Sequence, residues 1–254
     1  MFPEKKVSPL FSIIKSAVGL FVKKCKIYGI ENLPEQDAVI IANHCQMTGP
    51  IYGELFMKNN CYIWCAGQLM NLKDVPAYAF EDFWSKKPKA SKPLYKALSY
   101  IIAPLSVVVF NNARTIGVYH DSRLLSTFRT SLNHLKKGGN ILIFPETHET
   151  HNNIVYKFQN RFVDLAKMYH NSTGKKIKFV PLYISPKLGA MYFGKPTEFC
   201  PENDIKEERE RVCRYLSETI TDIAVGLPKH KVVPYSNIPK KKYLTNKDVT
   251  EVPE

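Results

Sequence analysis

The stretch AVIIANHCQMTGP, residues 38–50, decides the expected fold, because an uninterrupted apolar run ends in it at Asn43 and His44 and is followed by Gly49 and Pro50. Its first five residues have the length and β-branched content of a strand that is covered on both faces, as in parallel sheets. Such sheets carry their chemistry just beyond the carboxyl ends of their strands. His44 falls at that position, so we consider it a candidate catalytic residue; an ordinary polar loop histidine is the alternative.

Similar apolar runs recur along the chain and alternate with amphipathic segments. Strands are predicted at residues 27–30, 61–66, 105–110, 140–144 and 178–185. Helices are predicted at residues 51–57, 77–84, 94–102, 121–137, 158–170 and 204–225. Strands that alternate with helices are typical of parallel pairing through right-handed crossovers. The sequence therefore predicts an α/β fold with a mostly parallel central sheet flanked by helices.

The composition is compatible with one large domain and two extensions. The 254 residues are 44% hydrophobic and 12% aromatic, enough to bury a substantial core. We expect an N-terminal helical segment at 1–26, an α/β domain at 27–227 and an extended tail at 228–254. The six cysteines include no CxxC pair and no secretory signal precedes them, which predicts reduced thiols in a cytoplasmic protein.

The formal charge of +13 suits either nucleic acid or an anionic membrane surface as a partner. Residues 1–30 carry six lysines, and residues 83–120 carry five lysines and Arg114 without any acid. Both stretches are interleaved with large apolar side chains, an arrangement that favours a membrane interface. The chain has no RNA-binding signature, so we predict no nucleic-acid partner.

Residues 7–24, VSPLFSIIKSAVGLFVKK, space Leu10, Ile13, Ile14, Ala17 and Phe21 as one face of a helix. The apolar run is shorter than the roughly 20 residues that span a bilayer, and Lys15 interrupts it in a way that a signal peptide does not. We expect an amphipathic helix that lies in the membrane interface, and packing onto the protein's own core is the alternative. The predicted location is cytoplasmic, peripheral on the inner face of the membrane.

A series of short motifs follows one another in a characteristic order. Asn43-His44 comes after GIENLP at residues 29–34, Phe144-Pro145-Glu146 closes a later strand, and then come Phe158, Leu165-Ala166 and FVPLYI at residues 179–184. In this order residues 27–186 resemble the glycerolipid acyltransferase superfamily, which includes the 1-acyl-glycerol-3-phosphate acyltransferases. The resemblance implies an acyltransferase-like α/β fold and acyl transfer with His44 as general base.

The chain departs from the family pattern at two places. The family has an Asp that orients the histidine where this chain has Gly49, and a phosphate-binding Arg where it has Glu149. We expect Glu146 or Glu149 to accept a hydrogen bond from the His44 ring in place of the missing Asp. A carboxylate in place of the Arg predicts against lysophosphatidic acid as the acceptor. The resemblance implies substrate-binding roles for Asn43, Gln46, Asn112, Arg114, Thr147 and His148.

The resemblance implies transfer of an acyl group from acyl-CoA or acyl carrier protein to a hydroxyl or an amine. A catalytically silent lipid- or acyl-carrier-binding protein and an acyl-thioester hydrolase are the alternatives. His148 and His151 with Glu146 or Glu149 offer metal-ligand types, but their spacing is not that of a zinc signature. We therefore predict no metal and no cofactor apart from the acyl donor as co-substrate.

Overall fold

The computed structural model describes residues 7–22, 24–85, 87–119, 121–147, 149, 153–235 and 238–248. Their contacts divide the chain into two compact units. The first unit holds the residues up to 22 and residues 62–130, and the second holds residues 23–61 and everything from 131 onward.

The second unit is built on a sheet with the predicted central strand, β2 (Ala38–Ala42), whose five residues are all buried. It pairs in parallel with β5 (Asn140–Ile143) and with β6 (Lys178–Ser185). The register sets Ile41 opposite Ile143 on one side and Pro181 on the other. Because β2 is covered on both faces and flanked on both edges, every position in it is apolar, as the continuous run predicted.

Three more strands extend this sheet beyond β6. The strand β7 (Ala190–Phe193) and the short β8 (Thr197–Glu198) pair antiparallel with β6, and β1 (Lys26–Tyr28) pairs in parallel with β7. The prediction of a mostly parallel sheet flanked by helices is confirmed, and the bounds of β2 and β6 are those predicted. The strands β7 and β8 were not predicted.

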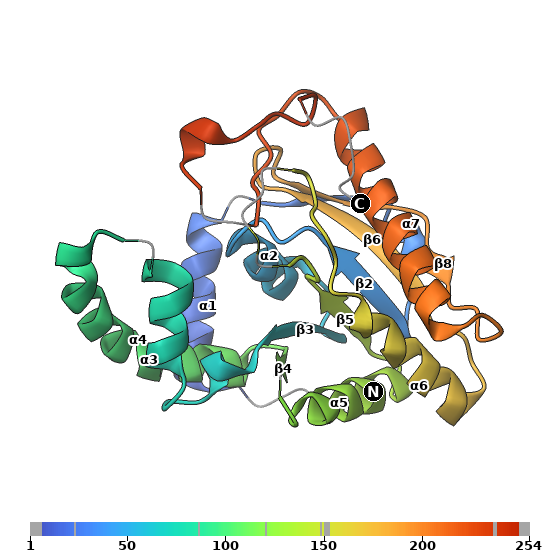
Figure 1. Ribbon diagram of the computed structural model, residues 1–254, viewed down its shortest axis with the longest axis horizontal. Coiled ribbons are helices and arrows are strands. Elements are labelled where there is room, and N and C mark those ends of the chain that lie inside the picture. The colour runs from blue at the N-terminus through green and yellow to red at the C-terminus, as the bar shows by residue number, and fades with distance from the viewer. Residues whose placement is uncertain are drawn as a thin grey trace. The chain divides into compact units, whose positions relative to one another are not determined.

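The helices of this unit come between its strands and after them. They are α2 (Thr48–Phe56), α6 (Asp164–Thr173) and α7 (Ile205–Gly226), and α5 (Leu124–Lys136) crosses the boundary between the units. Helix α7 packs against β6 (Figure 1). Its buried residues include Val212, Leu216, Ile220 and Ala224. Short 3-10 turns lie at Ile30–Asn32, Asn160–Val163 and Lys240–Lys242.

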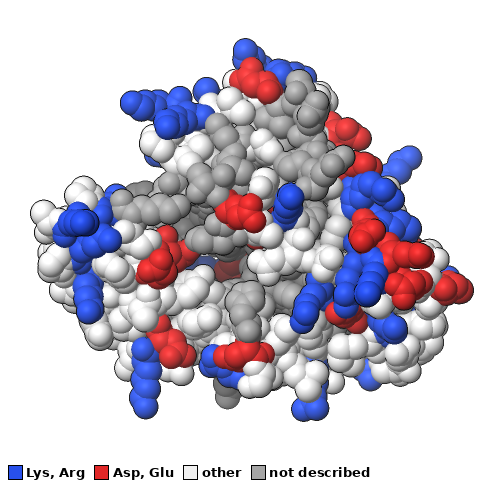
Figure 2. Space-filling view, in the orientation of Figure 1, with Lys and Arg blue, Asp and Glu red and all other residues white. Residues whose placement is uncertain are grey.

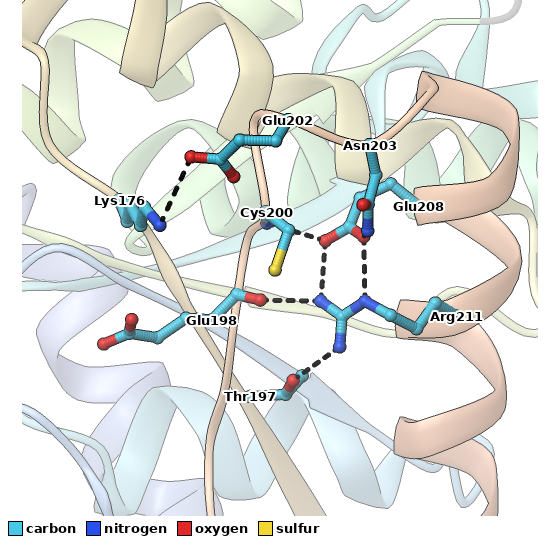
Figure 3. A network of polar contacts seen from close by, with 8 residues as sticks. All are labelled: Lys176, Thr197, Glu198, Cys200, Glu202, Asn203, Glu208 and Arg211. Carbon is cyan, nitrogen blue, oxygen red and sulfur yellow. Dashed lines mark hydrogen bonds and ion pairs between the residues drawn. The ribbon is translucent and has the colours of Figure 1, made fainter.

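A buried ion pair ties the start of α7 to β8 (Figure 3). The Glu208 side chain is fully buried and accepts hydrogen bonds from Arg211, from the amide of Cys200 and from Asn203. Arg211 also donates to the carbonyl of Glu198. These bonds hold the chain that enters α7.

The first unit contains α1 (Pro9–Phe21), α3 (Val75–Ala79), α4 (Lys92–Asn112) and the parallel pair β3 (Cys61–Ala66) and β4 (Thr115–Val118). A π-helical turn, Phe80–Trp84, continues α3, and 3-10 turns lie at Gly67–Met70 and Lys89–Ser91. Val75 and Ala79 of α3 form a small core with Ala103 of α4. The helix starting at Pro9 and the bounds of β3 agree with the prediction.

The prediction of a strand at residues 105–110 is wrong, because these residues form the last turns of α4. Their valines favour strands only weakly, since helix propensity differs by less than about 1 kcal/mol per residue among ordinary residues. Packing of Val107 against the core of α3 and α4 outweighs that preference. The strand of this region is β4, which begins after Arg114.

Two helices of the first unit leave large apolar side chains exposed. Helix α1 buries Phe11 but exposes Ile13, Leu20 and Phe21, and α4 exposes Leu94, Tyr100, Ile101 and Leu105. Residues Lys89–Asn112 are long and apolar enough to cross a membrane, with a mean hydropathy of 1.6 over a stretch that is only 11% buried. In Figure 2 the surface over α3 and α4 is largely uncharged, with basic side chains gathered near its outer end.

Candidate active site

The candidate site lies in the second unit, where β2 and β5 end side by side. Because the two strands are parallel, the loops that follow their carboxyl ends meet. Oε1 of Glu146 accepts a hydrogen bond of 2.7 Å from the main-chain nitrogen of His44. The two residues that the sequence analysis proposed as catalytic are therefore brought together.

The turn that carries His44 is tied to the neighbouring strand β6 by its own side chains. Asn43 is buried; its Oδ1 accepts from the amide of Ile184 and its Nδ2 donates to the carbonyl of the same residue. The thiol of Cys45 donates to that carbonyl as well, at 3.2 Å. Asn43 therefore fixes the end of β2 in its position, and the substrate contact proposed for it stays a prediction.

Two consecutive residues of this turn, Cys45 and Gln46, have positive φ angles of 50° and 54°. Side chains other than glycine rarely adopt this left-handed conformation, and each instance costs of order 1 kcal/mol or more. The conformation directs the carbonyl of Gln46 back to the His44 ring, where its oxygen lies 2.7 Å from Nδ1. The side chain of Gln46 donates to the hydroxyl of Tyr243 at 3.0 Å.

The contact with the Gln46 carbonyl determines the tautomer of His44. A carbonyl oxygen only accepts hydrogen bonds, so Nδ1 carries the proton, and in the neutral ring the lone pair is on Nε2. The acceptor at Nδ1 is a main-chain carbonyl and not Glu146 or Glu149, and a contact of either carboxylate with Nε2 stays a prediction. The hydrogen bond between Glu146 and His44 is to the main chain, and Glu149 accepts from the hydroxyl of Tyr156 at 2.9 Å.

Glu146 acts as a buried support of the loop structure. Its two carboxylate oxygens accept from different main-chain nitrogens, Oε1 from His44 and Oε2 from Tyr156 at 3.2 Å. Glu146 also forms an isolated antiparallel bridge with Phe158. A carboxylate that bonds main-chain amides is a strong acceptor, so these bonds hold two loops around one side chain.

Aromatic rings enclose the imidazole of His44. The ring of Tyr235 stacks on it with centroids 4.2 Å apart and planes 27° apart, and the ring of Phe144 lies tilted at 5.1 Å. The sequence analysis missed Tyr235 and Tyr243, which belong to the predicted extended tail. The signal for them is the presence of large aromatic residues in an otherwise polar, proline-containing segment.

Cys45, directly after His44, is not suited to be a nucleophile. Its side chain is buried, and burial together with the charge of Glu146 raises the pKa of the thiol well above its ordinary value. A thiol with a raised pKa stays protonated and unreactive at neutral pH. The chemistry of the turn therefore centres on His44.

The remaining predicted site residues fall into three groups. Thr147 donates its amide to the carbonyl of Lys157, and its hydroxyl is buried without a hydrogen-bond partner among the described residues. Asn112 and Arg114 belong to the first unit, where Asn112 accepts from the amide of Ser8 at the start of α1 and the carbonyl of Arg114 accepts from Ile63. His148 lies outside the described residues, as does His151.

The loop after β5 carries His and Glu residues, which are types that bind metal ions. Among the residues that the structure describes, no three or more His, Cys, Asp or Glu side chains are placed to hold a metal ion. The described part of this loop contributes Glu146, which accepts from the main chain of His44, and Glu149, which accepts from Tyr156.

Comparisons with known proteins found similarity to a solved structure. No protein-family model matches the sequence, and no curated protein matches it. The solved structure is the 1-acyl-sn-glycerophosphate (LPA) acyltransferase PlsC from Thermotoga maritima, which aligns with a TM-score of 0.42 and 16% sequence identity. The alignment covers 82% of this chain and 79% of that chain.

Proposed function

We propose that the chain is an acyltransferase that moves an acyl group from acyl-CoA or acyl carrier protein to a hydroxyl or an amine. The observation that carries this proposal is the contact of 2.7 Å between Nδ1 of His44 and the carbonyl of Gln46. It makes Nε2 the basic nitrogen and holds the ring in one orientation. A general base needs both properties, because it must present a lone pair to the proton that it removes.

In this mechanism Nε2 of His44 takes the proton of the acceptor as its oxygen or nitrogen attacks the thioester carbonyl. The tetrahedral intermediate carries an oxyanion, and α2, which begins four residues after His44, offers the positive end of its dipole to that charge. Three residues at the start of α2, 49–51, could supply an amide for this oxyanion. Pro50 has no amide hydrogen and the amide of Ile51 donates to Met47, so we assign the role to the amide of Gly49. The imidazolium then returns its proton to the leaving thiolate.

The acceptor proposed for this site lacks a phosphate. Glu149 occupies the place in the motif order where a phosphate-binding Arg is expected, and a carboxylate repels phosphate. Glu149 is exposed, so solvent reduces the repulsion between its carboxylate and a phosphate. Charge repulsion at a loop that carries no compensating Arg still favours a neutral hydroxyl or an amine as the acceptor.

A membrane surface is the proposed partner, with the chain peripheral on its cytoplasmic face. Leu20 and Phe21 of α1 are 86% and 91% exposed, and Ile101 of α4 is 72% exposed, while lysines at positions 87, 89, 92 and 96 lie around the start of α4. Apolar side chains beside lysines are the combination that binds the interface of an anionic membrane. The two helices contact each other within the first unit, so they can form one membrane-facing surface.

The experiment measures thiol release from acyl-CoA and from acyl carrier protein with a panel of hydroxyl, amine and phosphate-bearing acceptors on vesicles. We expect acceptor-dependent release that His44→Ala lowers by roughly 10²- to 10⁴-fold. The matched control is His170→Ala, because His170 lies in α6 with its Nδ1 also near a carbonyl, that of Lys175. Release without an acceptor identifies a hydrolase, and acyl-donor binding without turnover identifies a silent binding protein; either result overturns the proposal.

A further inference from the structure

The C-terminal segment of the second unit forms a closed loop, which we call the strap (residues 230–235 and 238–246). Its two ends pair with each other, since the amide of Val232 donates to Leu244 and the amide of Asn246 donates to His230. An isolated antiparallel bridge joins Lys231 and Thr245. The strap is therefore an ordered hairpin-like element, and the predicted extended tail is structured over these residues.

Both ends of the strap are anchored in the core of the unit. His230 is buried, its Nδ1 lies 2.7 Å from the carbonyl of Pro228, and its Nε2 accepts from the hydroxyl of Tyr183 on β6. The buried side chain of Asn246 donates to the carbonyls of Ala224 and Leu227 at the end of α7. These bonds fix the two ends of the strap to β6 and to the end of α7.

Two tyrosines of the strap reach the turn of His44. Tyr235 stacks on the imidazole ring at 4.2 Å, and the hydroxyl of Tyr243 accepts from the side chain of Gln46 at 3.0 Å. The main-chain carbonyl of Gln46 is the acceptor at Nδ1 of His44. The strap thus contacts the face of the His44 ring directly. It also contacts Gln46, the residue that determines the tautomer of His44.

We infer that Tyr235 and Tyr243 are positioning residues for His44, which rests on the proposed role of His44 as general base. The hydrogen bond at Nδ1 restrains rotation of the ring, and the stacked Tyr235 restrains its tilt. The lone pair of Nε2 lies in the ring plane, so a ring stacked on the face does not occupy the direction from which a proton arrives. Together the two tyrosines supply the orientation that a carboxylate partner gives in other general-base sites.

Stacking also acts on the charged state of the base. The face of a tyrosine ring is electron-rich and attracts a cation within about 6 Å of its centroid. Tyr235 therefore stabilises the imidazolium that exists after His44 has taken the proton. Because that charge develops in the transition state, the effect appears in kcat and leaves KM unchanged.

The first test compares Tyr235→Ala with Tyr235→Phe in acyl transfer and in thermal unfolding. Tyr235→Ala is expected to lower kcat roughly 3- to 30-fold with unchanged KM and Tm. Tyr235→Phe restores kcat, because stacking requires the ring and not the hydroxyl. Tyr28→Ala is the control, since it removes a tyrosine stacked on Tyr192 away from His44 and leaves kcat unchanged. A higher KM with normal kcat overturns the inference, because it makes Tyr235 a substrate contact.

The second test does not depend on activity and so separates this inference from the proposed function. The ¹⁵N chemical shifts of the imidazole, assigned with His44→Ala, report which nitrogen carries the proton in the neutral ring. Wild-type protein is expected to show the Nδ1–H tautomer, and Tyr243→Phe is expected to add a population of the Nε2–H form. If Tyr235→Leu and Tyr243→Phe both leave the tautomer unchanged, the inference is wrong. If the wild type transfers no acyl group, only the proposed function fails.

Discussion

At the residue scale, the turn after His44 leaves no space for a side chain at Gly49. A Cβ at this position lies 2.2 Å from the carbonyl oxygen of His44 and 2.9 Å from the ring of Phe144. The turn that directs the Gln46 carbonyl to the imidazole also brings the His44 carbonyl against residue 49. A side chain at residue 49 would therefore disturb the turn that holds His44.

We predict that Gly49→Asp lowers both Tm and acyl transfer and does not improve the base. Even Gly49→Ala is expected to cost about 1–3 kcal/mol of unfolding free energy, because the main chain must move to admit a methyl group. Gly19→Ala is the matched control, since Gly19 is also helical and has nothing within 4 Å of its Cβ position. Greater activity in Gly49→Asp would show that the turn can be rebuilt around a carboxylate.

Glu146→Gln tests the buried support of the site. Both oxygens of Glu146 accept from main-chain N–H groups, and a Gln side chain offers one oxygen and places an NH₂ against the second donor. We expect a loss of about 1–3 kcal/mol in urea unfolding and a fall in kcat. The matched variant Glu149→Gln is expected to be tolerated, because its partner is the hydroxyl of Tyr156, which can turn to suit an amide.

At the scale of elements, the sequence was most informative where burial was complete. Strands β2 and β6 had the predicted bounds because both are buried along nearly their whole length, which requires continuous apolar runs. The C-terminal turns of α4 were mistaken for a strand because an apolar run of Val and Ser is compatible with either structure. The contact with α3 resolved that ambiguity, and local sequence cannot show such a contact.

Helix α1 yields a prediction about the membrane. Leu20→Asp combined with Phe21→Asp is expected to weaken binding to anionic vesicles at least about tenfold, because each exposed apolar side chain contributes roughly 1.5–3 kcal/mol when it is buried in lipid. Sedimentation with vesicles measures the binding, and an unchanged Tm shows that the helix still packs through Phe11. Leu125→Asp is the control, since Leu125 of α5 is exposed to 52%. Unchanged vesicle binding contradicts a membrane role for α1.

At the scale of the whole molecule, acid is expected to weaken the fold through buried groups such as Glu208 and His230. Burial alone raises the pKa of Glu208, but its bonds with Arg211, the Cys200 amide and Asn203 outweigh burial and leave the pKa below its ordinary value of 4.5. Burial and the charge of Lys247 lower the pKa of His230 from 6.5, although its bond to Pro228 opposes them. Each group binds fewer protons in the folded state than in the unfolded state, so stability falls with falling pH.

We therefore predict that the urea midpoint falls in two steps, the first starting as the pH drops through about 6.5 and the second below about 4.5. His230→Gln is expected to reduce the first step, because an amide oxygen still accepts from Tyr183 but does not titrate. His134, whose pKa is also lowered by burial, supplies the rest of that step. An unaltered first step in His230→Gln would contradict the assignment.

The sequence by itself determined the class of the fold and the meeting of His44 with Glu146. Both follow from strand order, since parallel strands end at one edge of a sheet and bring the residues after them together.

Only the tertiary structure decided how His44 is held. Its Nδ1 partner is a main-chain carbonyl, which every residue has and whose direction depends on the left-handed φ angles of Cys45 and Gln46. Its ring partner, Tyr235, lies far along the chain and is placed by the buried anchors of the strap. Neither feature has a residue-type signature, because one depends on main-chain conformation and the other on a long-range contact.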